Sequence, residues 1–550
     1  MGNSLLSGVS GLQAHQRMLD AAGDNLANVN TTAFKSSRVN FAALLSETMR
    51  EATQPTSNVG GTNPMQIGSG VVVSSVDRNM SQGSLQNTGQ PLDMAIEGSG
   101  YFCLSDAKGE VFTRVGAFAV DSQFNLVDPA TGFRVQRIGS EGVSEGFQSA
   151  FSSNIRIPYD VALPANATQN ISYTGTLSAN ATAPTLHKLT SGIAYTRNGT
   201  AASVDTKLNE LDQVAGLLAG DTIAISGYDR TGTAVGPVAF SIFNGDGTSK
   251  TVGDLLTAIQ TAFPDSNAVM GEGRLLLSDK EMGYSKTDLA LTFGSTTGGE
   301  FTLPKYFTLE QAGGRAALST NVQVYDAQGV GHEMAASFVR TNDPNKWDLV
   351  VTSITGDVDL VSRRIEGITF LADGSYGGTG SVSPSIQLVY ANDPTNVRTV
   401  NLNFGTIGEY NGLSQAGDTS TVSTSGQDGY ANGWLSSLSV SREGVLVGVF
   451  TNGIRRDIAA LKIATFQNAA GLTSVGNNYF LSSANSGQAV PTRGLSGGAG
   501  AVRGGALEKS NVEVATEFVN LINAQNGYQA NARTIKVANE MLRELTNLIR

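Results

Sequence analysis

The sequence has 550 residues, of which 40% are hydrophobic and 15% are charged, and its formal net charge is −11. A chain of this length builds several domains, and this apolar content excludes wholesale disorder. The negative charge without a basic cluster argues against nucleic-acid binding, and the absence of an 18-residue apolar run argues against insertion into a membrane.

The N-terminal segment, residues 1–30, predicts an α-helix with one apolar stripe. Seven-residue spacing keeps apolar side chains on one side of a helix. The stripe consists of Leu5, Val9, Leu12, Leu19 and Leu26. Three glycines interrupt it, and each costs about 1 kcal/mol relative to Ala in a helix. We therefore expect this helix to need a partner surface.

The segment 31–75 contains Pro55, Pro64 and several glycines, which predicts an extended connector. Alternating apolar residues then predict antiparallel strands over 76–155, and the same pattern returns over 426–483. Asn452-Gly453 is a strong hairpin signal within the second block. Two such blocks, far apart in sequence, predict one inner β domain built from both arms of the chain.

The central region predicts two further domains inserted into the inner one. Residues 156–190 with 315–425 are expected to form a middle β domain, and residues 191–314 an outer α+β domain. Two helical patterns fall in the outer domain, one from Leu208 to Leu218 and one from Leu255 to Phe263. Thr251 is a candidate N-cap for the second.

The C-terminal segment, 506–550, predicts one long helix that follows a Gly- and Ser-rich connector over 484–505. Ser510 and Glu513 have the spacing of a capping box. The apolar stripe of this helix again has seven-residue spacing, with two further apolar residues beside it. Its members are Val514, Phe518, Leu521, Tyr528, Ile535, Leu542, Leu545 and Ile549.

The two terminal helices are expected to pair as a coiled coil. Burying each Leu or Ile side chain contributes about 1.5–3 kcal/mol. A plain two-helix stalk that buries itself is one interpretation. A polymer, in which each pair also packs against pairs from neighbouring subunits, is the other. Apolar residues outside the main stripe favour the polymer. The predicted fold class is multidomain and mainly β, with nested antiparallel sandwich- or barrel-like β domains on an α-helical inner domain.

Catalytic chemistry is not indicated. The three histidines are far apart in the sequence, and the single cysteine, Cys103, lies in a strand-like run and cannot form an intramolecular disulfide. We expect no metal, no cofactor and no enzymatic activity. A secreted β-rich carbohydrate-cleaving enzyme and a secreted β-rich adhesin stay as alternatives.

Both ends of the chain carry motifs of a known family. Asn-Leu-Ala-Asn-x-x-Thr-x-x-Phe-Lys runs from Asn25 to Lys35, and Tyr-Gln-Ala-Asn-Ala-x-Thr-Ile-Lys runs from Tyr528 to Lys536. Together with Leu507–Val512, these stretches resemble the terminal signatures of bacterial flagellar rod and hook proteins. The motif residues are Asn25, Asn28, Thr31, Phe34, Lys35, Tyr528, Asn531, Thr534 and Lys536.

The resemblance covers about 1–155 and 425–550, with a weaker hook-like match over 320–329. The large central insertion favours a hook member, and a distal rod protein of the same family is the alternative. The resemblance implies a homopolymeric curved tube that acts as a universal joint and transmits motor torque to the filament. It also implies contacts with the distal rod protein, the hook cap and the hook–filament junction proteins. The expected location is the extracellular hook, reached by export without a cleaved signal peptide.

Overall fold

The computed structural model describes residues 2–106, 109–180, 183–295, 298–381, 383–417 and 419–548. The chain forms two compact units, Met1–Leu163 with Gly433–Arg550 (unit 1) and Pro164–Asn432 (unit 2). Strands dominate both units. Unit 1 is built from both ends of the chain, because unit 2 is one continuous insertion between Leu163 and Gly433.

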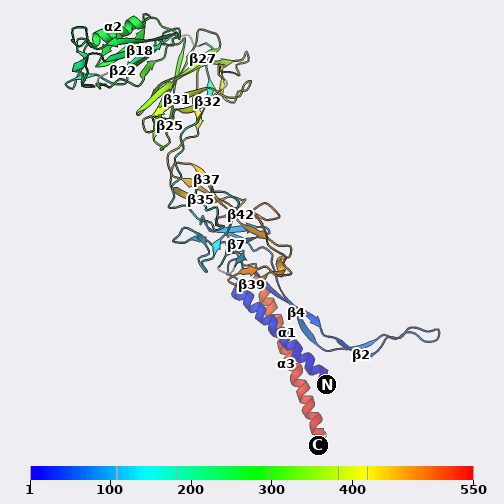
Figure 1. Ribbon diagram of the computed structural model, residues 1–550. Coiled ribbons are helices and arrows are strands. Elements are labelled where there is room, and N and C mark those ends of the chain that lie inside the picture. The colour runs from blue at the N-terminus through cyan, green and yellow to red at the C-terminus, as the bar shows by residue number, and fades with distance from the viewer. Residues whose placement is uncertain are drawn as a thin grey trace. The chain divides into compact units, whose positions relative to one another are not determined.

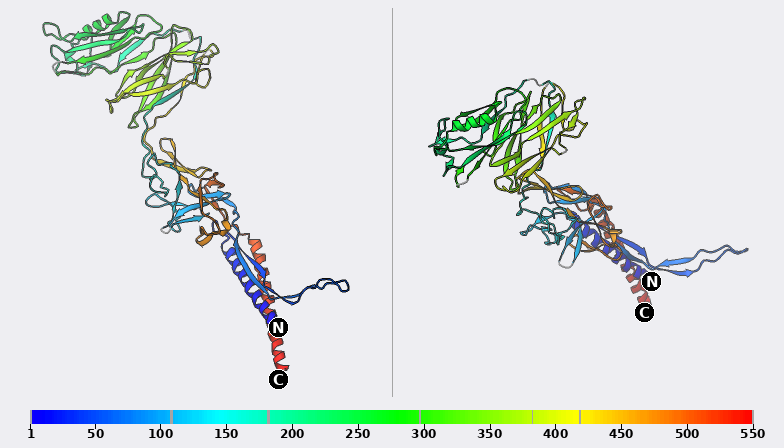
Figure 2. Two further views of the ribbon diagram at one scale, coloured as in Figure 1. Left: turned by 45° about the vertical axis from the view of Figure 1, so that its right-hand side comes forward. Right: turned by 45° about the horizontal axis from the view of Figure 1, so that its top comes forward.

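Two long helices of unit 1 lie side by side, α1 (Gly2–Ala27) in blue and α3 (Val514–Leu548) in red (Figure 1). Two further views show the same pairing (Figure 2). Contacts between Gly8 and Ile535 and between Asn25 and Glu517 make the pair antiparallel. The predicted pairing of the terminal helices is therefore confirmed.

A two-stranded ribbon follows α1 and projects from the helix pair (Figures 1 and 2). We call this ribbon the arm. Its strands are β1 (Ser37–Ala43), β2 (Ser46–Arg50), β3 (Met65–Gly68) and β4 (Val71–Arg78). β1 pairs with β4 and β2 pairs with β3, both antiparallel. The expectation of an extended connector over 31–75 is therefore wrong. Pro55 and Pro64 lie outside the strands, in the tip, where no ladder hydrogen bond is required of them.

The remaining strands of unit 1, which we call the β body, come from both the N-terminal and the C-terminal parts of the chain. Its largest sheet has the strands β7 (Tyr101–Ser105), β8 (Glu110–Thr113), β9 (Ala119–Val120), β10 (Leu126–Val127), β11 (Arg134–Val135), β38 (Ile463–Thr465), β39 (Thr473–Gly476), β40 (Tyr479–Leu481) and β41 (Val490–Thr492). A second sheet contains β12 (Arg137–Ile138), β35 (Leu435–Val440), β36 (Val445–Phe450) and β37 (Arg455–Leu461). The Asn452-Gly453 hairpin is confirmed, since it joins β36 to β37 with Gly453 at φ 80°.

Two short pairs complete unit 1 and correct two boundaries. β42 (Ala501–Gly504) pairs with β6 (Met94–Glu97), and β43 (Ala506–Glu508) pairs with β5 (Leu85–Asn87). The connector predicted over 484–505 is therefore wrong, because β41 and β42 both belong to the β body. The helix predicted from 506 begins only at Val514, since Ala506–Glu508 is held as a strand. Ser510 and Glu513 precede the helix and form no capping box.

The first core of unit 2 lies between two sheets. One contains β25 (Ala317–Tyr325), β26 (Gly331–Arg340), β27 (Lys346–Ile354), β29 (Arg364–Phe370) and β30 (Tyr376–Gly378). The other contains β13 (Asn170–Thr176), β28 (Val358–Ser362), β31 (Ser385–Tyr390), β32 (Arg398–Asn403), β33 (Leu413–Ser414) and β34 (Ser423–Gln427). The sequence analysis expected antiparallel pairing. β13 instead runs parallel to β32 and to β33.

A second core of unit 2 is built mainly by residues 189–312. Its strands are β14 (Lys188–Ser191), β15 (Thr196–Arg197), β16 (Thr200–Ala201), β17 (Val214–Ala215), β18 (Thr222–Tyr228), β19 (Ala234–Ser241), β20 (Ser266–Gly271), β21 (Arg274–Asp279), β22 (Asp288–Gly294), β23 (Glu300–Phe301) and β24 (Phe307–Gln311). Val339 of β26 and Val350 of β27 also belong to it, while Phe338 and Leu349 face the first core. One sheet therefore serves both cores.

The two helices predicted in this region have different outcomes. α2 (Val252–Ala262) is confirmed, and Thr251 caps it in a capping box with Asp254. The helix predicted from Leu208 is wrong, because only a 3₁₀ turn, Leu208–Glu210, forms before β17. Leu208 and Leu211 are nevertheless buried in the second core. The spacing of these leucines correctly predicted that they are buried. It did not predict the backbone conformation, which depends on tertiary packing.

His187 gives unit 2 a testable pH dependence. It is buried just before β14, where its Nε2 donates to the Thr287 carbonyl at 2.7 Å and its Nδ1 accepts from the Gly313 N–H at 3.1 Å. Burial, and then the charge of Arg364, lower the pKa of His187 to about 3. The unfolded chain binds this proton near pH 6.5, so the free energy of unfolding falls as the pH drops from about 6.5 toward 3, by up to about 1.4 kcal/mol per pH unit.

Urea unfolding of a Trp434→Phe background, whose fluorescence then comes from Trp347 in the first core, should show this loss between pH 7.5 and pH 5. His187→Gln removes the titrating group, so its stability should depend much less on pH over the same range. Equal slopes for the two proteins would contradict the prediction.

Candidate polymerisation site

Small residues let α1 and α3 approach closely. A Cβ at Gly8 would lie 2.9 Å from Ile535 Cγ1, and one at Gly11 would lie 2.6 Å from Asn531 Oδ1. On α3, a Cβ at Gly527 would lie 2.4 Å from the His15 ring. Gly8 and Gly11, two of the three glycines that interrupt the leucine pattern, are thus contact points, where a missing side chain makes room for a side chain of the other helix.

The predicted stripe residues divide into two groups. Eight are partly buried within unit 1, namely Leu5, Leu12, Leu19, Leu26, Leu521, Tyr528, Ile535 and Leu542. Four are exposed, namely Val9, Val514, Phe518 and Leu545. Ile549 lies outside the described residues. The seven-residue spacing therefore identified the side of each helix that meets its partner, except at Val514 at the start of α3, while the residues beside the stripe remain open to solvent.

Sequence reasoning missed part of the exposed apolar surface of α3. Val519, Ile522, Val537 and Met541 are each about half exposed. Together with Val514, Phe518 and Leu545, they form two groups, one near each end of α3, separated by the polar stretch around Gln529. A four-residue spacing from Val514 through Phe518 to Ile522 was the available signal. Clustered exposed apolar side chains of this kind mark surfaces that bind other proteins.

The N-terminal family motif forms a joint where α1 ends and the arm begins. Asn25 is fully buried, and its amide donates to the Ser37 carbonyl at 2.8 Å and to Glu517 Oε1 at 3.1 Å. The Ser37 N–H donates back to Asn25 Oδ1 at 2.8 Å. Asn25 thereby connects α1, β1 and α3. Asn28 donates to the Asp24 carbonyl and accepts from the Thr31 hydroxyl, which satisfies groups at the helix end.

A buried ion cluster closes the joint. Lys35 Nζ lies 2.6 Å from Glu508 Oε1, and Arg114 Nη1 lies 3.4 Å from Glu508 Oε2. Lys35 also donates to the Ser81 carbonyl, and the Gly83 N–H donates to Glu508. Burial lowers the pKa of Lys35, against the opposing effect of Glu508. The cluster ties the last residue of the N-terminal motif to β43 and to the β body.

The other motif residues have less uniform surroundings. Phe34 is partly buried, and Asn531 packs beside Gly11 and donates to the Gly527 carbonyl. Thr534 and Lys536 are exposed on α3. The N-terminal motif is thus mainly a joint that sets the chain direction, while the C-terminal motif lies partly on the contact with α1 and partly on the open surface.

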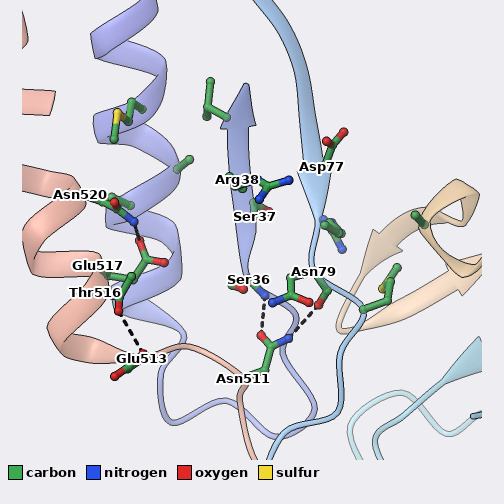
Figure 3. A pocket seen from close by; sticks show the side chains of 17 residues that line it. Ser36, Ser37, Arg38, Asp77, Asn79, Asn511, Glu513, Thr516, Glu517 and Asn520 are labelled. Carbon is green, nitrogen blue, oxygen red and sulfur yellow. Dashed lines mark hydrogen bonds between the residues drawn. The ribbon is translucent and has the colours of Figure 1, made fainter. Parts of the chain in front are cut away.

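A hollow of about 740 Å³ lies beside the joint, between α1, the base of the arm and the start of α3 (Figure 3). Asn511 bridges its floor: its Oδ1 accepts from the Ser36 N–H at 2.8 Å and its Nδ2 donates to the Asn79 carbonyl at 2.7 Å. Arg38, Asp77 and Glu517 also line it. We call this feature the joint hollow.

The geometry around these residues serves packing. Across the ranges that the structure describes, no three His, Cys, Asp or Glu residues gather as metal ligands would. None of the described helices has the length and apolar character that crossing a membrane requires. Cys103 is buried in β7, and burial raises the pKa of its thiol to about 12. A protonated, enclosed thiol is a poor nucleophile.

Comparison with known proteins agrees with the terminal motifs. Residues 5–35 match the flagella basal body rod protein model and 503–548 the flagellar basal body rod FlgEFG protein C-terminal model. Residues 95–179 match the flagellar hook protein FlgE/F/G D1 domain and 295–430 the flagellar basal body protein FlaE D2 domain. The chain is also 30% identical to the flagellar hook protein FlgE of Treponema pallidum over 555 residues, which covers 100% of both chains. The chain belongs to the flagellar hook protein family.

A second hook protein gives the same result. The hook protein FlgE of Borreliella burgdorferi is 29% identical over 563 residues, with 100% of both chains covered. The crystal structure of Helicobacter pylori flagellar hook protein FlgE2 aligns with a TM-score of 0.39 and 16% identity over 76% of this chain and 99% of that chain. The chain is a structural subunit of the bacterial flagellar hook, and the comparisons do not favour the rod-protein or adhesin alternatives.

The buried ion cluster of this hook subunit can be tested by removing its anion. Glu508→Gln leaves Lys35 and Arg114 buried without a counter-charge, which should lower the free energy of unfolding of unit 1 by about 3–5 kcal/mol. Glu110→Gln, which breaks the more exposed pair with Lys462, should cost at most about 1 kcal/mol. Denaturant unfolding of both variants measures this difference, and similar costs would refute the special role of Glu508.

The close helix contact can be tested with two alanine substitutions. Gly527→Ala puts a methyl group against the His15 ring, and overpacking of this kind costs about 1–3 kcal/mol. Gly23→Ala meets nothing within 4 Å, so it should stabilise α1 by about 1 kcal/mol through helix propensity. Thermal melting followed by far-UV circular dichroism should shift in opposite directions for the two variants. A stabilising Gly527→Ala would disprove the close contact.

Proposed function

We propose that this hook subunit polymerises through its terminal helices into a curved, flexible tube that acts as a universal joint and transmits motor torque to the filament. The exposed apolar surface of α3 is the observation that carries the proposal. Phe518, Ile522 and Met541 stay about half exposed after α1 and α3 have paired. A self-contained stalk has no use for such a surface, whereas neighbouring helix pairs in a polymer would bury it.

The helix pair is proposed to hold the tube together, with the predicted stripe as its interface. Leu12, Leu19, Tyr528 and Ile535 join the two helices of one subunit, and Val9, Val514, Phe518 and Leu545 face its neighbours. The β bodies would then form outer layers whose Ser- and Thr-rich surfaces make weaker contacts. Such contacts can exchange partners while a bent tube rotates.

Assembly is proposed to follow export of the unfolded chain through the growing structure, without cleavage of a signal peptide. A chain with the single cysteine Cys103 cannot be locked by an intramolecular disulfide, which supports threading. The distal rod protein, the hook cap and the hook–filament junction proteins are the proposed partners at the ends of the tube. The middle and outer β domains are proposed to give the tube its outer diameter.

A charge on the exposed surface of α3 tests the polymer. Phe518→Asp should abolish tube formation by the purified chain, as seen by electron microscopy, because a carboxylate would be desolvated between helix pairs. Asn523→Asp is the matched control, since Asn523 is an exposed polar residue about 140° around the same helix from Phe518. Near-identical circular dichroism of the two variants would show that the subunit still folds. Normal tubes from Phe518→Asp would refute the proposed interface.

A further inference from the structure

The two cores of unit 2 lie next to each other (Figure 1). We call the zone where residues 284–309 pack against β27, β28 and β29 the seam. β24 packs on β27 here, and Val350 of β27 belongs to the second core. A hollow of about 330 Å³ nevertheless opens in the seam, and its apolar lining includes Leu309 and Val361. Apolar packing is therefore incomplete at the seam, and polar contacts supply part of the connection there.

Arg363, which lies between β28 and β29, reaches across the seam. Its side chain is only 10% exposed. Its Nη1 donates to Asp288 Oδ1 of β22 at 2.9 Å, and its Nη2 donates to the Phe307 carbonyl of β24 at 2.6 Å. The guanidinium also lies 5.5 Å from the centroid of the Tyr306 ring. One side chain from the first-core side of the seam therefore binds two strands of the second core.

Arg364, the first residue of β29, makes a second set of contacts beside the first. Its Nη2 donates to the Ser285 carbonyl at 3.0 Å, and its Nη1 lies 3.3 Å from Oδ2 of the buried Asp348 on β27. The Tyr284 hydroxyl donates to the same carboxylate oxygen from the other side of the seam. Burial, and then the charge of Asp348, raise the pKa of Tyr284. The phenol therefore stays protonated and keeps its role as a donor.

Four hydrogen bonds thus cross the seam, two from Arg363, one from Arg364 and one from Tyr284. Hydrogen bonds to charged groups are roughly twice as strong as neutral ones, and a planar guanidinium also fixes the direction of its partners. Separating the two cores would break all four contacts together and would leave Asp348 without these partners.

We propose that Arg363 and Arg364 form a clamp that makes the two cores of unit 2 open and move as one body. Residues 189–312 are then not a separately hinged part of the chain, and unit 2 is a single stiff element. This property belongs to the individual subunit, so it goes beyond polymerisation and does not depend on it.

Amide hydrogen exchange of the full-length subunit before polymerisation, read by mass spectrometry, tests the clamp. At low denaturant concentrations β18 of the second core and β32 of the first core should converge on one exchange rate, because neither core opens alone. Arg363→Met keeps an apolar stem but removes the contacts with Asp288 and the Phe307 carbonyl. Exchange in β18 should then rise by about 10- to 100-fold relative to β32, the factor that corresponds to losing hydrogen bonds to a charged group.

Lys286→Met is the matched control, because the Lys286–Glu366 pair at 2.8 Å crosses the same seam but is more exposed. It should change exchange in β18 by less than about threefold. If Arg363→Met fails to fold, Tyr284→Phe takes its place, since it removes a single hydroxyl from the seam and should raise β18 exchange about tenfold relative to β32.

Three outcomes would overturn the clamp. The first is a wild-type chain in which β18 exchanges ahead of β32. The second is a parallel rise in both strands of the arginine or tyrosine variant. The third is an effect of that variant no larger than the effect of Lys286→Met. None of these outcomes bears on tube formation, so the proposed function is tested separately.

Discussion

The buried contact between Lys35, Glu508 and Arg114 is the constraint on which the rest of unit 1 depends. Three charged side chains are almost completely enclosed, and Glu508 lies within 3.4 Å of both Lys35 and Arg114, which offsets the cost of burying their charges. Lys35 lies in the N-terminal part of the chain and Glu508 in the C-terminal part. The contact therefore exists only when both ends of a 550-residue chain have met, and it holds the strand β43 that directs α3 back along α1.

The helix pair shows how a polymer subunit can fold while keeping its adhesive surface open. Glycines at positions 8, 11 and 527 bring the two backbones close, so small residues and a single stripe suffice for pairing. Phe518, Ile522 and Met541 are then left exposed. A broader contact between α1 and α3 would bury those side chains and remove the surface through which neighbouring helix pairs are proposed to pack. Under this proposal, narrow intramolecular packing is a condition for assembly.

Prediction from the sequence succeeded where local chemistry decides. The terminal helices, α2 with its Thr251 cap and the Asn452-Gly453 hairpin follow from periodicity, capping and turn preference. It failed where distant segments decide. Residues 31–75 read as a connector because Pro55 and Pro64 dominate the pattern, yet β1 and β4 find each other across them. The composition of 484–505 is typical of a linker, yet β42 within it pairs with β6, a strand about 400 residues earlier in the chain.

The sequence by itself determined the class of protein, because the motifs from Asn25 to Lys35 and from Tyr528 to Lys536 are linear patterns. It also determined which side of each helix is apolar, since helical geometry alone converts spacing into a stripe. Only the tertiary structure decided that Gly8 and Gly11 of α1 are contact points, that Lys35 and Glu508 form a buried pair, and that a hollow lies beside the joint. Each of these depends on groups that are hundreds of residues apart in the chain, and local spacing carries no information about their distance in space.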